Sequence, residues 1–355
     1  MSSWTSSRSL LSTSAEQPSA GVGPGDRRRA TVPIIVGLVV SAGLLWWTMR
    51  GLQLADVVRH VRGARPLPLL LSVALATLTF PLRAFRWRAL LRDSADRLLP
   101  AGAAWHGIAI GYLANNVLPL RAGEILRAYA VTRLAPVRLS SAVASVAVER
   151  VFDALTVVAM LGIALLAAGL PGDVRIAGLP VSQLAQRIGL AAAVAFLLAA
   201  VVLSRPHAFA MWCERVIPFK GLARRMVALL EGIRAGLSVL RSPGRLAVVV
   251  GWSIAIWLVN ALSFLALFPA FGLRIDLAGA VLVQSAIVFG IAVPSSPGYV
   301  GVFEAAIVLA LALYGVAQDQ ALAYAVTYHA ATFVPITLLG LYSLTRTPLA
   351  WRDLR

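Results

Sequence analysis

Long apolar runs, separated by short polar stretches, organise almost the whole chain. An apolar run of about 20 residues is long enough to cross a bilayer as an α-helix. Such runs predict full spans near residues 32–49, 66–84, 140–168, 188–204, 246–268 and 320–344. The pattern therefore predicts an all-α, polytopic membrane protein with six full spans.

Two further apolar runs are interrupted in their deep part by polar or helix-breaking residues. The run at 101–119 ends at Pro119 after two asparagines, and the run at 278–293 ends at Pro294 before two serines. Backbone that leaves a helix at membrane depth must be covered by protein or line a wet cavity. Both runs are therefore predicted to form re-entrant helical hairpins.

The predicted elements occur in the same order twice: span, span, hairpin, span. Pro119 and Gly123 share their spacing with Pro297 and Gly301, which lie 178 positions later. If the second set enters from the opposite face, this is the inverted-topology repeat of many transporters. The alternative is chance, because proline, glycine and alanine are abundant in this chain.

The same pattern predicts the domain organisation. A serine-rich stretch without apolar periodicity predicts a disordered cytoplasmic tail at 1–30. A transmembrane domain at 31–345 follows, with halves at 31–170 and 187–345, and a short cytoplasmic tail occupies 346–355.

Composition narrows the classes of protein. With 59% hydrophobic and 13% charged residues, the chain is neither a soluble nor a disordered protein. The single cysteine, Cys213, excludes an internal disulfide, and the four histidines lack metal-ligand spacing, so we expect no metal and no cofactor.

The net charge of +17 has two interpretations, nucleic-acid binding or cytoplasmic loops that face anionic lipid. No segment resembles a nucleic-acid-binding module, so we expect no nucleic-acid partner. The proposed topology, with both termini in the cytoplasm, places most of the 32 Lys and Arg residues on the cytoplasmic side. Membrane lipids, anionic or polyprenyl-linked, are the expected partners, and the sequence gives no oligomeric state.

The first candidate cluster surrounds the break at Pro119 and Gly123. A helix that restarts there would direct its positive end at an anionic headgroup. Two arginines three residues either side of Glu124 could pair with it and keep a donor free for phosphate. The alternative is an ordinary charged cytoplasmic loop. The predicted binding residues are Asn115, Asn116, Arg121, Glu124 and Arg127.

The second cluster consists of Glu149, Arg150 and Asp153, which lie inside an apolar run. Each charge at the centre of a spanning helix costs about 2.5–3.5 kcal/mol, so these groups must be paired or hydrated. Arg150 can reach Asp153 at a spacing of three residues. We predict a headgroup site here, and the alternative is a salt bridge that only locks helices together.

The third cluster follows the second helix break. The predicted helix breakers are Pro294, Pro297, Gly298 and Gly301, and the predicted binding residues are Ser295, Ser296, Glu304 and His329. Glu304 lies in an apolar run without a neighbouring cation in sequence. We expect its partner to come from elsewhere, with His329 and Arg150 as candidates.

At these clusters the chain resembles the transmembrane region of bacterial lysylphosphatidylglycerol synthases, which are flippase-like membrane proteins. The resemblance covers about residues 31–345 and rests on four segments, which are 83–87, 116–127, 149–153 and 297–304. It implies an integral protein of the bacterial inner membrane that moves a charged or lipid-linked headgroup between leaflets. Tyr328-His329 departs from the tyrosine-arginine that is frequent in the family, which leaves the charge of the second half open.

Three functions remain as hypotheses. The preferred one is a lipid translocator. The second is an intramembrane enzyme that modifies a polyprenyl-phosphate or phospholipid headgroup, with Glu124 or Glu149 as the base. The third is a non-catalytic membrane subunit. Because no segment is long and polar enough, we expect no aminoacyl-transferase domain and no catalytic residues, and translocation is favoured over chemistry.

Overall fold

The computed structural model describes residues 24–95, 97–118, 122–167, 243–292 and 295–349, with short stretches between 175 and 194. This part is mainly helical and includes one antiparallel pair of two-residue strands, β1 (Arg175–Ile176) and β2 (Leu179–Pro180). Among the described residues, four helices are long and apolar enough to cross a membrane. They are α3 (Pro66–Leu90), α6 (Leu139–Ala167), α10 (Pro243–Leu267) and α13 (Gln318–Thr345).

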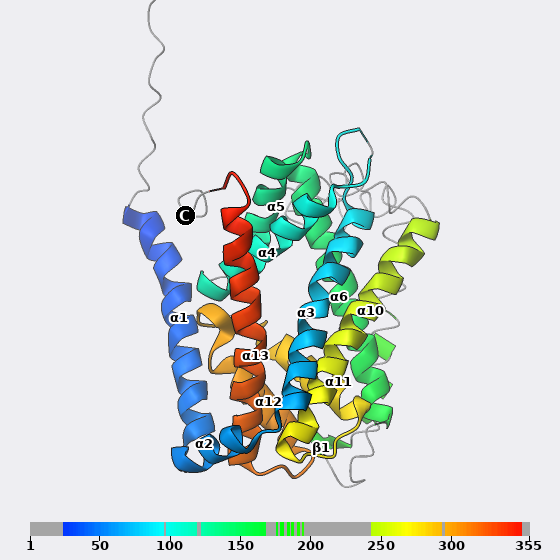
Figure 1. Cartoon of the computed structure of the whole chain (residues 1–355). Coiled ribbons are helices and arrows are strands. Elements are labelled where there is room, and N and C mark those ends of the chain that lie inside the picture. The colour runs from blue at the N-terminus through cyan, green and yellow to red at the C-terminus, as the bar shows by residue number, and fades with distance from the viewer. Residues whose placement is uncertain are drawn as a thin grey trace, which may run out of the picture.

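A fifth candidate span combines α1 (Pro24–Met49) with the short helix α2 (Leu54–Gly63), and the two are bent by 83°. In Figure 1, α1 stands at the side of the bundle and α2 lies across its lower end. The first residues of α1, from Pro24, overlap the end of the stretch 1–30 that was expected as a tail. Pro24 opens the helix, and proline suits the first helical turn because its missing N–H has no partner there anyway.

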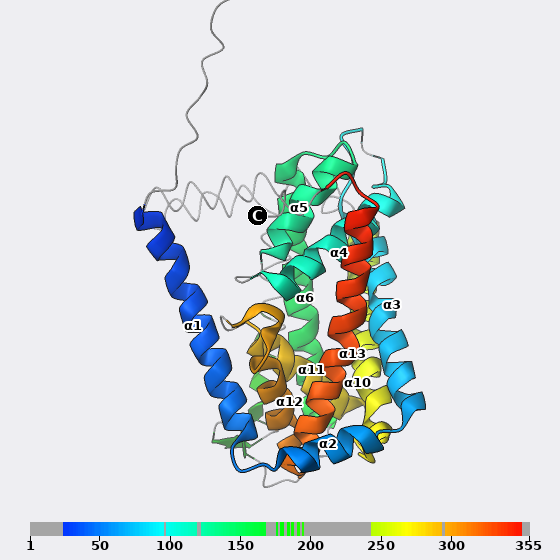
Figure 2. The ribbon, with the colours of Figure 1, turned by 60° about the vertical axis from the view of Figure 1, so that its left-hand side comes forward.

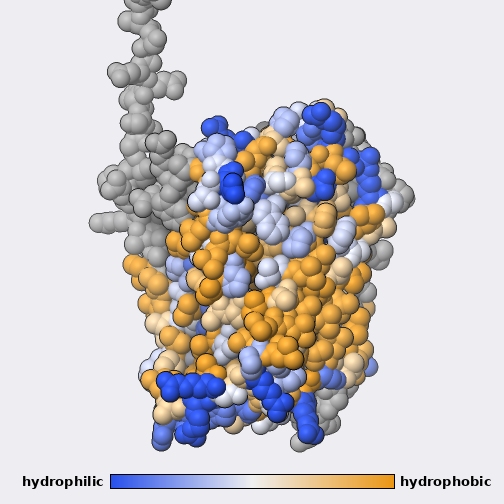
Figure 3. Space-filling view, in the orientation of Figure 1, coloured by the Kyte–Doolittle hydropathy of each residue, from blue (hydrophilic) through white to orange (hydrophobic). Residues whose placement is uncertain are grey.

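The outer surface of the bundle matches a bilayer. Figure 3 shows hydrophobic residues across the middle of the visible face and hydrophilic residues at both ends. Large apolar side chains such as Leu67, Ile163 and Leu338 are mostly exposed. Together with the long apolar helices, this surface identifies a multi-pass membrane protein.

The predicted spans at 66–84, 140–168, 246–268 and 320–344 coincide with α3, α6, α10 and α13, and the run at 32–49 lies in α1. The predicted span at 188–204 falls almost entirely outside the described residues.

The two interrupted runs form pairs of shorter helices. The first pair is α4 (Ala101–Val117) and α5 (Gly123–Leu134), and the second is α11 (Leu277–Gly290) and α12 (Val302–Ala312), with the short 3₁₀ turn η3 (Pro297–Tyr299) between them. We call residues 115–123, around the gap between α4 and α5, the first break. Residues 291–301, between α11 and α12, are called the second break. The two pairs lie toward opposite ends of the bundle (Figure 1).

The two breaks touch each other inside the bundle. α4 packs against η3, and a Cβ built on Gly298 would lie 3.5 Å from the carbonyl oxygen of Asn116. Gly298 and Gly301 have φ of +68° and +89°, which L side chains rarely adopt, so glycine is required at both helix breakers. Figure 2 shows the second break between α1 and the rest of the bundle.

Helix α1 supports the second break. The backbone N–H of Ser296 donates to Oγ of Ser41 at 2.8 Å, and Gly37 lies against the backbone of Ser295. Buried apolar side chains also form two large clusters. One includes residues of α10, α11, α12 and α13, and the other includes residues of α3, α4, α5 and α6. The breaks are therefore enclosed by protein, as backbone without helical hydrogen bonds requires in a membrane.

Candidate functional site

A cavity of about 560 Å³ lies where the two breaks meet. Side chains from α3, α4, α5, α6, α10, α11, α12 and α13 line it. Most of its wall is apolar, and its charged lining residues are Arg83, Glu124, Arg127, Arg150 and Asp153. A mostly apolar cavity with a few convergent polar groups is the usual form of a ligand site.

Three guanidinium groups surround the fully buried carboxylate of Glu149. One nitrogen of each lies 2.9 to 3.0 Å from a Glu149 oxygen. The three side chains come from different helices and are Arg86 of α3, Arg127 of α5 and Arg150 of α6. A carboxylate in hydrocarbon requires such pairing, because its desolvation costs several kcal/mol.

Asp153 lies one helical turn beyond Glu149 and joins a fourth helix to the network. Its carboxylate contacts Arg86 at 2.5 Å and Arg150 at 2.9 Å. It also accepts a hydrogen bond of 2.9 Å from the indole N–H of Trp257 on α10. The predicted pair of Arg150 with Asp153 is therefore present. The network locks α3, α5, α6 and α10 together, as the salt-bridge alternative required.

Arg83 is the charged group that stands apart from this network. It is 7% exposed, lines the cavity, and forms no ion pair with any residue that the structure describes. Its guanidinium carbon lies 5.7 Å from the ring centre of Tyr112 and 5.6 Å from that of Trp257. Cation–π contacts of this kind stabilise a guanidinium without neutralising its charge.

Sequence reasoning missed Arg83 and Arg86 as site residues, because both follow the apolar run and resemble a cytoplasmic flank. Helix α3 continues to Leu90, and Trp87, Leu90 and Leu91 are fully buried beyond them. Apolar residues resume after Arg86 at helical spacing, and this pattern indicates that the helix continues past both arginines.

The prediction that Arg127 pairs with Glu124 is wrong. Arg127 turns to Glu149 and lies 4.8 Å from the ring centre of Trp87, whereas Glu124 faces Arg150 at 3.6 Å. The reason is close packing of α5 on α4: a Cβ on Gly123 would overlap the carbonyl oxygen of Gly111. Because α5 packs so closely on α4, the side chain of Arg127 lies inside the bundle, within reach of Glu149. Three predicted residues, Pro119, Arg121 and Pro294, lie outside the described residues.

The two asparagines of the first break have structural partners. Oδ1 of Asn115 accepts the backbone N–H of Gly123 at 2.9 Å and so connects the two sides of the break. Nδ2 of Asn116 donates to the hydroxyl of Thr337 on α13 at 3.0 Å. Both asparagines also line the cavity. Their role in binding a ligand stays a prediction.

The third cluster lies behind the cavity wall. Glu304 accepts the backbone N–H of Gly301 at 2.6 Å and contacts Nδ1 of His329 at 2.6 Å. His329, and not Arg150, is therefore the partner of Glu304. Ser295, Ser296, Glu304 and His329 do not line the central cavity, so the structure separates them from the first two clusters.

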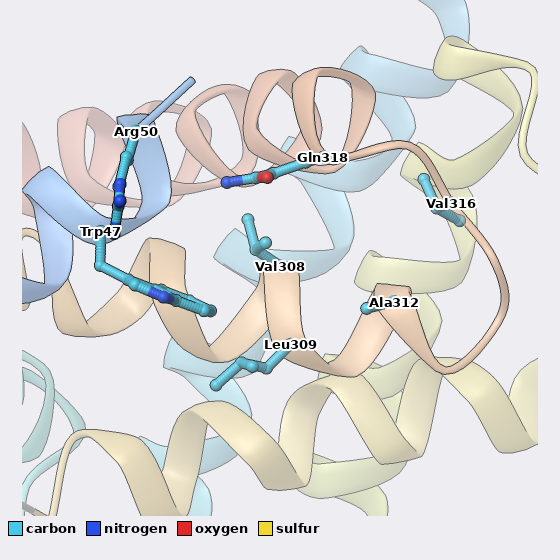
Figure 4. Close-up of a pocket in the computed structure, with 7 residues that line it drawn as sticks. All are labelled: Trp47, Arg50, Val308, Leu309, Ala312, Val316 and Gln318. Atoms are coloured by element: carbon cyan, nitrogen blue, oxygen red, sulfur yellow. The ribbon is translucent and has the colours of Figure 1, made fainter. Parts of the chain in front are cut away.

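A second cavity of about 360 Å³ lies between α1 and α12 and shares no lining residue with the first. Figure 4 shows Trp47 and Arg50 on one side and Val308, Leu309 and Ala312 on the other. Gln318 also lines it, but its amide donates to the backbone oxygen of Thr48. No cluster of His, Cys, Asp or Glu in the described part of the chain could hold a metal ion.

Comparison with known proteins places this arrangement in a family. A family model described as the lysylphosphatidylglycerol synthase TM region matches residues 34–340. The chain belongs to this family. A curated relative, Glycosyltransferase AglD from Haloferax volcanii, is 28% identical over 322 residues, which cover 80% of this chain and 49% of the relative. The chain thus spans about half the length of AglD.

Proposed function

We propose that this protein moves an anionic lipid headgroup between the two leaflets through the central cavity. The observation that carries the proposal is Arg83, a buried guanidinium that faces the cavity and has no counter-ion among the described residues. An uncompensated charge at such a position is costly, and an anionic ligand removes the cost. Membership of a family named for the membrane region of a phospholipid synthase agrees with a lipid ligand.

The proposed architecture has six full spans and two re-entrant hairpins, α4–α5 and α11–α12, in an inverted repeat. Reciprocal packing supports it: α3 packs against α10, α4 against α13, and α11 against α6. The ion pair Arg86–Glu149 of the first half corresponds to an uncharged pair in the second half. Ser263 lies 177 positions after Arg86, and Tyr328 lies 179 positions after Glu149. There the hydroxyls of Ser263 and Tyr328 are hydrogen-bonded at 2.6 Å.

Arg150 is the proposed switch between the empty and the loaded cavity. It is the most exposed arginine of the network, and its contact with Glu124 is its longest, at 3.6 Å. A phosphate that enters beside Arg83 can replace Glu124 on Arg150, because guanidinium groups bind phosphate with two parallel hydrogen bonds. The remaining contacts of Arg150 to Glu149 and Asp153 keep it in place during the exchange.

We propose the bacterial inner membrane as the location, with both termini in the cytoplasm. The end of the bundle that holds α4 and α5 then faces the cytoplasm. Five arginines near the connections on either side of these helices support that orientation, in agreement with the excess of Lys and Arg in cytoplasmic loops: Arg88, Arg92, Arg97, Arg133 and Arg138.

Transport by purified protein tests the proposal. Proteoliposomes would carry phosphatidylglycerol with a fluorescent acyl chain, and dithionite quenching would measure its movement between leaflets. We expect movement above that of empty vesicles, and a loss of at least about tenfold in Arg83→Gln. Arg59→Gln on exposed α2 is the matched control and should transport normally. No movement by the parent protein, or equal movement by Arg83→Gln, would contradict the proposal.

The name of AglD favours a second candidate, an enzyme that acts on a polyprenyl-phosphate or phospholipid headgroup. Glu124 is then the better base, because three guanidinium groups hold Glu149 while Glu124 has one distant partner among the described residues. Mass spectrometry of cell lipids separates the candidates. A modified headgroup that disappears in Glu124→Gln would favour the enzyme, and unchanged headgroups would favour transport.

A further inference from the structure

We propose that the cavity selects headgroups that combine one phosphate charge with an uncharged, hydroxyl-rich remainder, and that it rejects headgroups carrying an ammonium group. This inference rests on the proposed function and names its substrate class. Phosphatidylglycerol and glycosyl phosphates belong to the selected class, whereas aminoacylated and ethanolamine headgroups belong to the rejected one.

The charge balance of the site is the first step. Among the described residues of the cavity and its network, four guanidinium groups face three carboxylates, which leaves one excess positive charge. The excess resides on Arg83, whose partners among the described residues are the aromatic rings of Tyr112 and Trp257. One negative charge on the ligand therefore makes the loaded site neutral, and neutrality matters most where the surroundings are apolar.

The carboxylates are the second step, because an ammonium group would need one of them. Glu149 and Asp153 are buried and each contacts at least two arginines within 3.0 Å. Glu124 is more accessible, but it faces Arg150 at 3.6 Å. An ammonium group at Glu124 would only replace Arg150 as the partner of this carboxylate. A headgroup with one phosphate and one ammonium group brings no net charge, so the positive excess of the site would remain, and a second ammonium group would increase it.

The neutral polar groups of the cavity are the third step. Nδ2 of Asn260 donates to Oε1 of Gln284 at 2.7 Å, and both residues line the cavity. This bond leaves Nε2 of Gln284, in a side chain that is 1% exposed, without an acceptor among the described residues. A buried donor without a partner is costly, and a ligand hydroxyl can accept from it.

The aromatic lining agrees with such a remainder. Tyr112 and Trp257 both contact Arg83, and Tyr299 of the second break and Phe303 of α12 also line the cavity. A polyol or sugar presents C–H groups that pack on aromatic rings and hydroxyls that bond to amides. The phosphate would lie at Arg83 and the polyol would extend toward Asn260 and Gln284 on α10 and α11.

Three probe lipids with the same fluorescent acyl chain test the inference in proteoliposomes: phosphatidylglycerol, phosphatidylethanolamine and lysylphosphatidylglycerol. We expect phosphatidylglycerol to move at least about tenfold faster than the other two. Equal or faster movement of either ammonium-bearing lipid would overturn the inference and leave the proposed function standing. Movement of none of the three would instead refute the proposed function.

A charge substitution provides a second, independent test. Asn260→Asp adds a carboxylate to the cavity with little change of shape, so it should lower phosphatidylglycerol transport and raise transport of the two ammonium-bearing lipids. Gln53→Glu, on the surface before α2, is the matched amide-to-acid control and should leave the selectivity unchanged. If Asn260→Asp fails to fold, Gln284→Glu replaces it. An unchanged order of the three lipids in a folded variant would contradict the inference.

Discussion

Two glutamates on neighbouring helices illustrate how differently one residue type is used in this site. Glu149 is 1% exposed and bound by three arginines, whereas the side chain of Glu124 is 29% exposed and, in the part of the chain that the structure describes, has one partner at 3.6 Å. The first organises the bundle, and the second is free to exchange its partner. A carboxylate can therefore hold the structure or take part in the proposed exchange, depending on its burial.

This difference predicts unequal effects on stability. Glu149→Gln leaves buried guanidinium groups short of a counter-ion, which should lower the free energy of unfolding by about 3–5 kcal/mol. Glu124→Gln removes a partly exposed, distant pair and should cost less than about 1 kcal/mol. Thermal unfolding of both variants in the same detergent measures the difference. Similar melting temperatures for the two variants would contradict the assignment of Glu149 to the network.

Sequence alone identified part of this site. Glu149, Arg150 and Asp153 were recognisable because charges inside an apolar run must be paired. Arg83 and Arg86 were missed, because they lie at the end of the predicted span, although the apolar residues that resume after Arg86 at helical spacing indicated a longer helix. The pairing of Arg127 with Glu149 depends on how α5 packs on α4, and that contact is not encoded in local spacing.

At the scale of elements, the two helix breaks have different chemical support. In the first break, the Asn115 side chain accepts the N–H of Gly123, whereas in the second the backbone turns through two glycines with positive φ. Both breaks could be predicted from proline and glycine in apolar runs. The support that α1 gives to the second break through Ser41 could not, because the two segments are far apart in sequence.

The second break predicts a contrast between two glycines. At Gly301, φ is +89° and a Cβ would overlap the backbone of Ser41, so Gly301→Ala should cost about 1–3 kcal/mol from backbone strain alone. Gly43 on α1 has nothing within 4 Å of its Cβ position, so Gly43→Ala should be neutral or stabilising. Melting temperatures and transport rates of both variants check this. A stable, active Gly301→Ala would show that the break is not held as described.

At the scale of the whole molecule, the apolar belt identifies the membrane-facing surface, whereas the orientation in the membrane is a proposal. The surface carries hydrophilic residues at both ends, so composition does not distinguish the ends (Figure 3). The proposed orientation instead rests on the arginines near the connections of α4 and α5 and on the preference of such loops for the cytoplasm. Four of the six predicted spans coincide with long apolar helices of the structure, and the run at 32–49 lies in α1. The contact between the two breaks could not be predicted, because it depends on how helices from both halves pack.

This orientation is testable with a thiol reagent that does not cross membranes, in a Cys213→Ser background. Arg59→Cys on α2 should react in intact cells, because the proposed topology places that end outside the cytoplasm. Arg346→Cys after α13 should react only in permeabilised cells. The opposite pattern would invert the topology, and equal labelling of both positions from outside would contradict an odd number of crossings between them.

The central claim is that a lipid phosphate binds in the cavity between the two breaks. An experimental structure of the full chain in nanodiscs of phosphatidylglycerol tests it most directly. We predict headgroup density in contact with the guanidinium of Arg83 and next to Asn260, with the acyl chains leading out toward the bilayer. A cavity filled only by acyl chains, or a headgroup bound away from Arg83, would contradict the account.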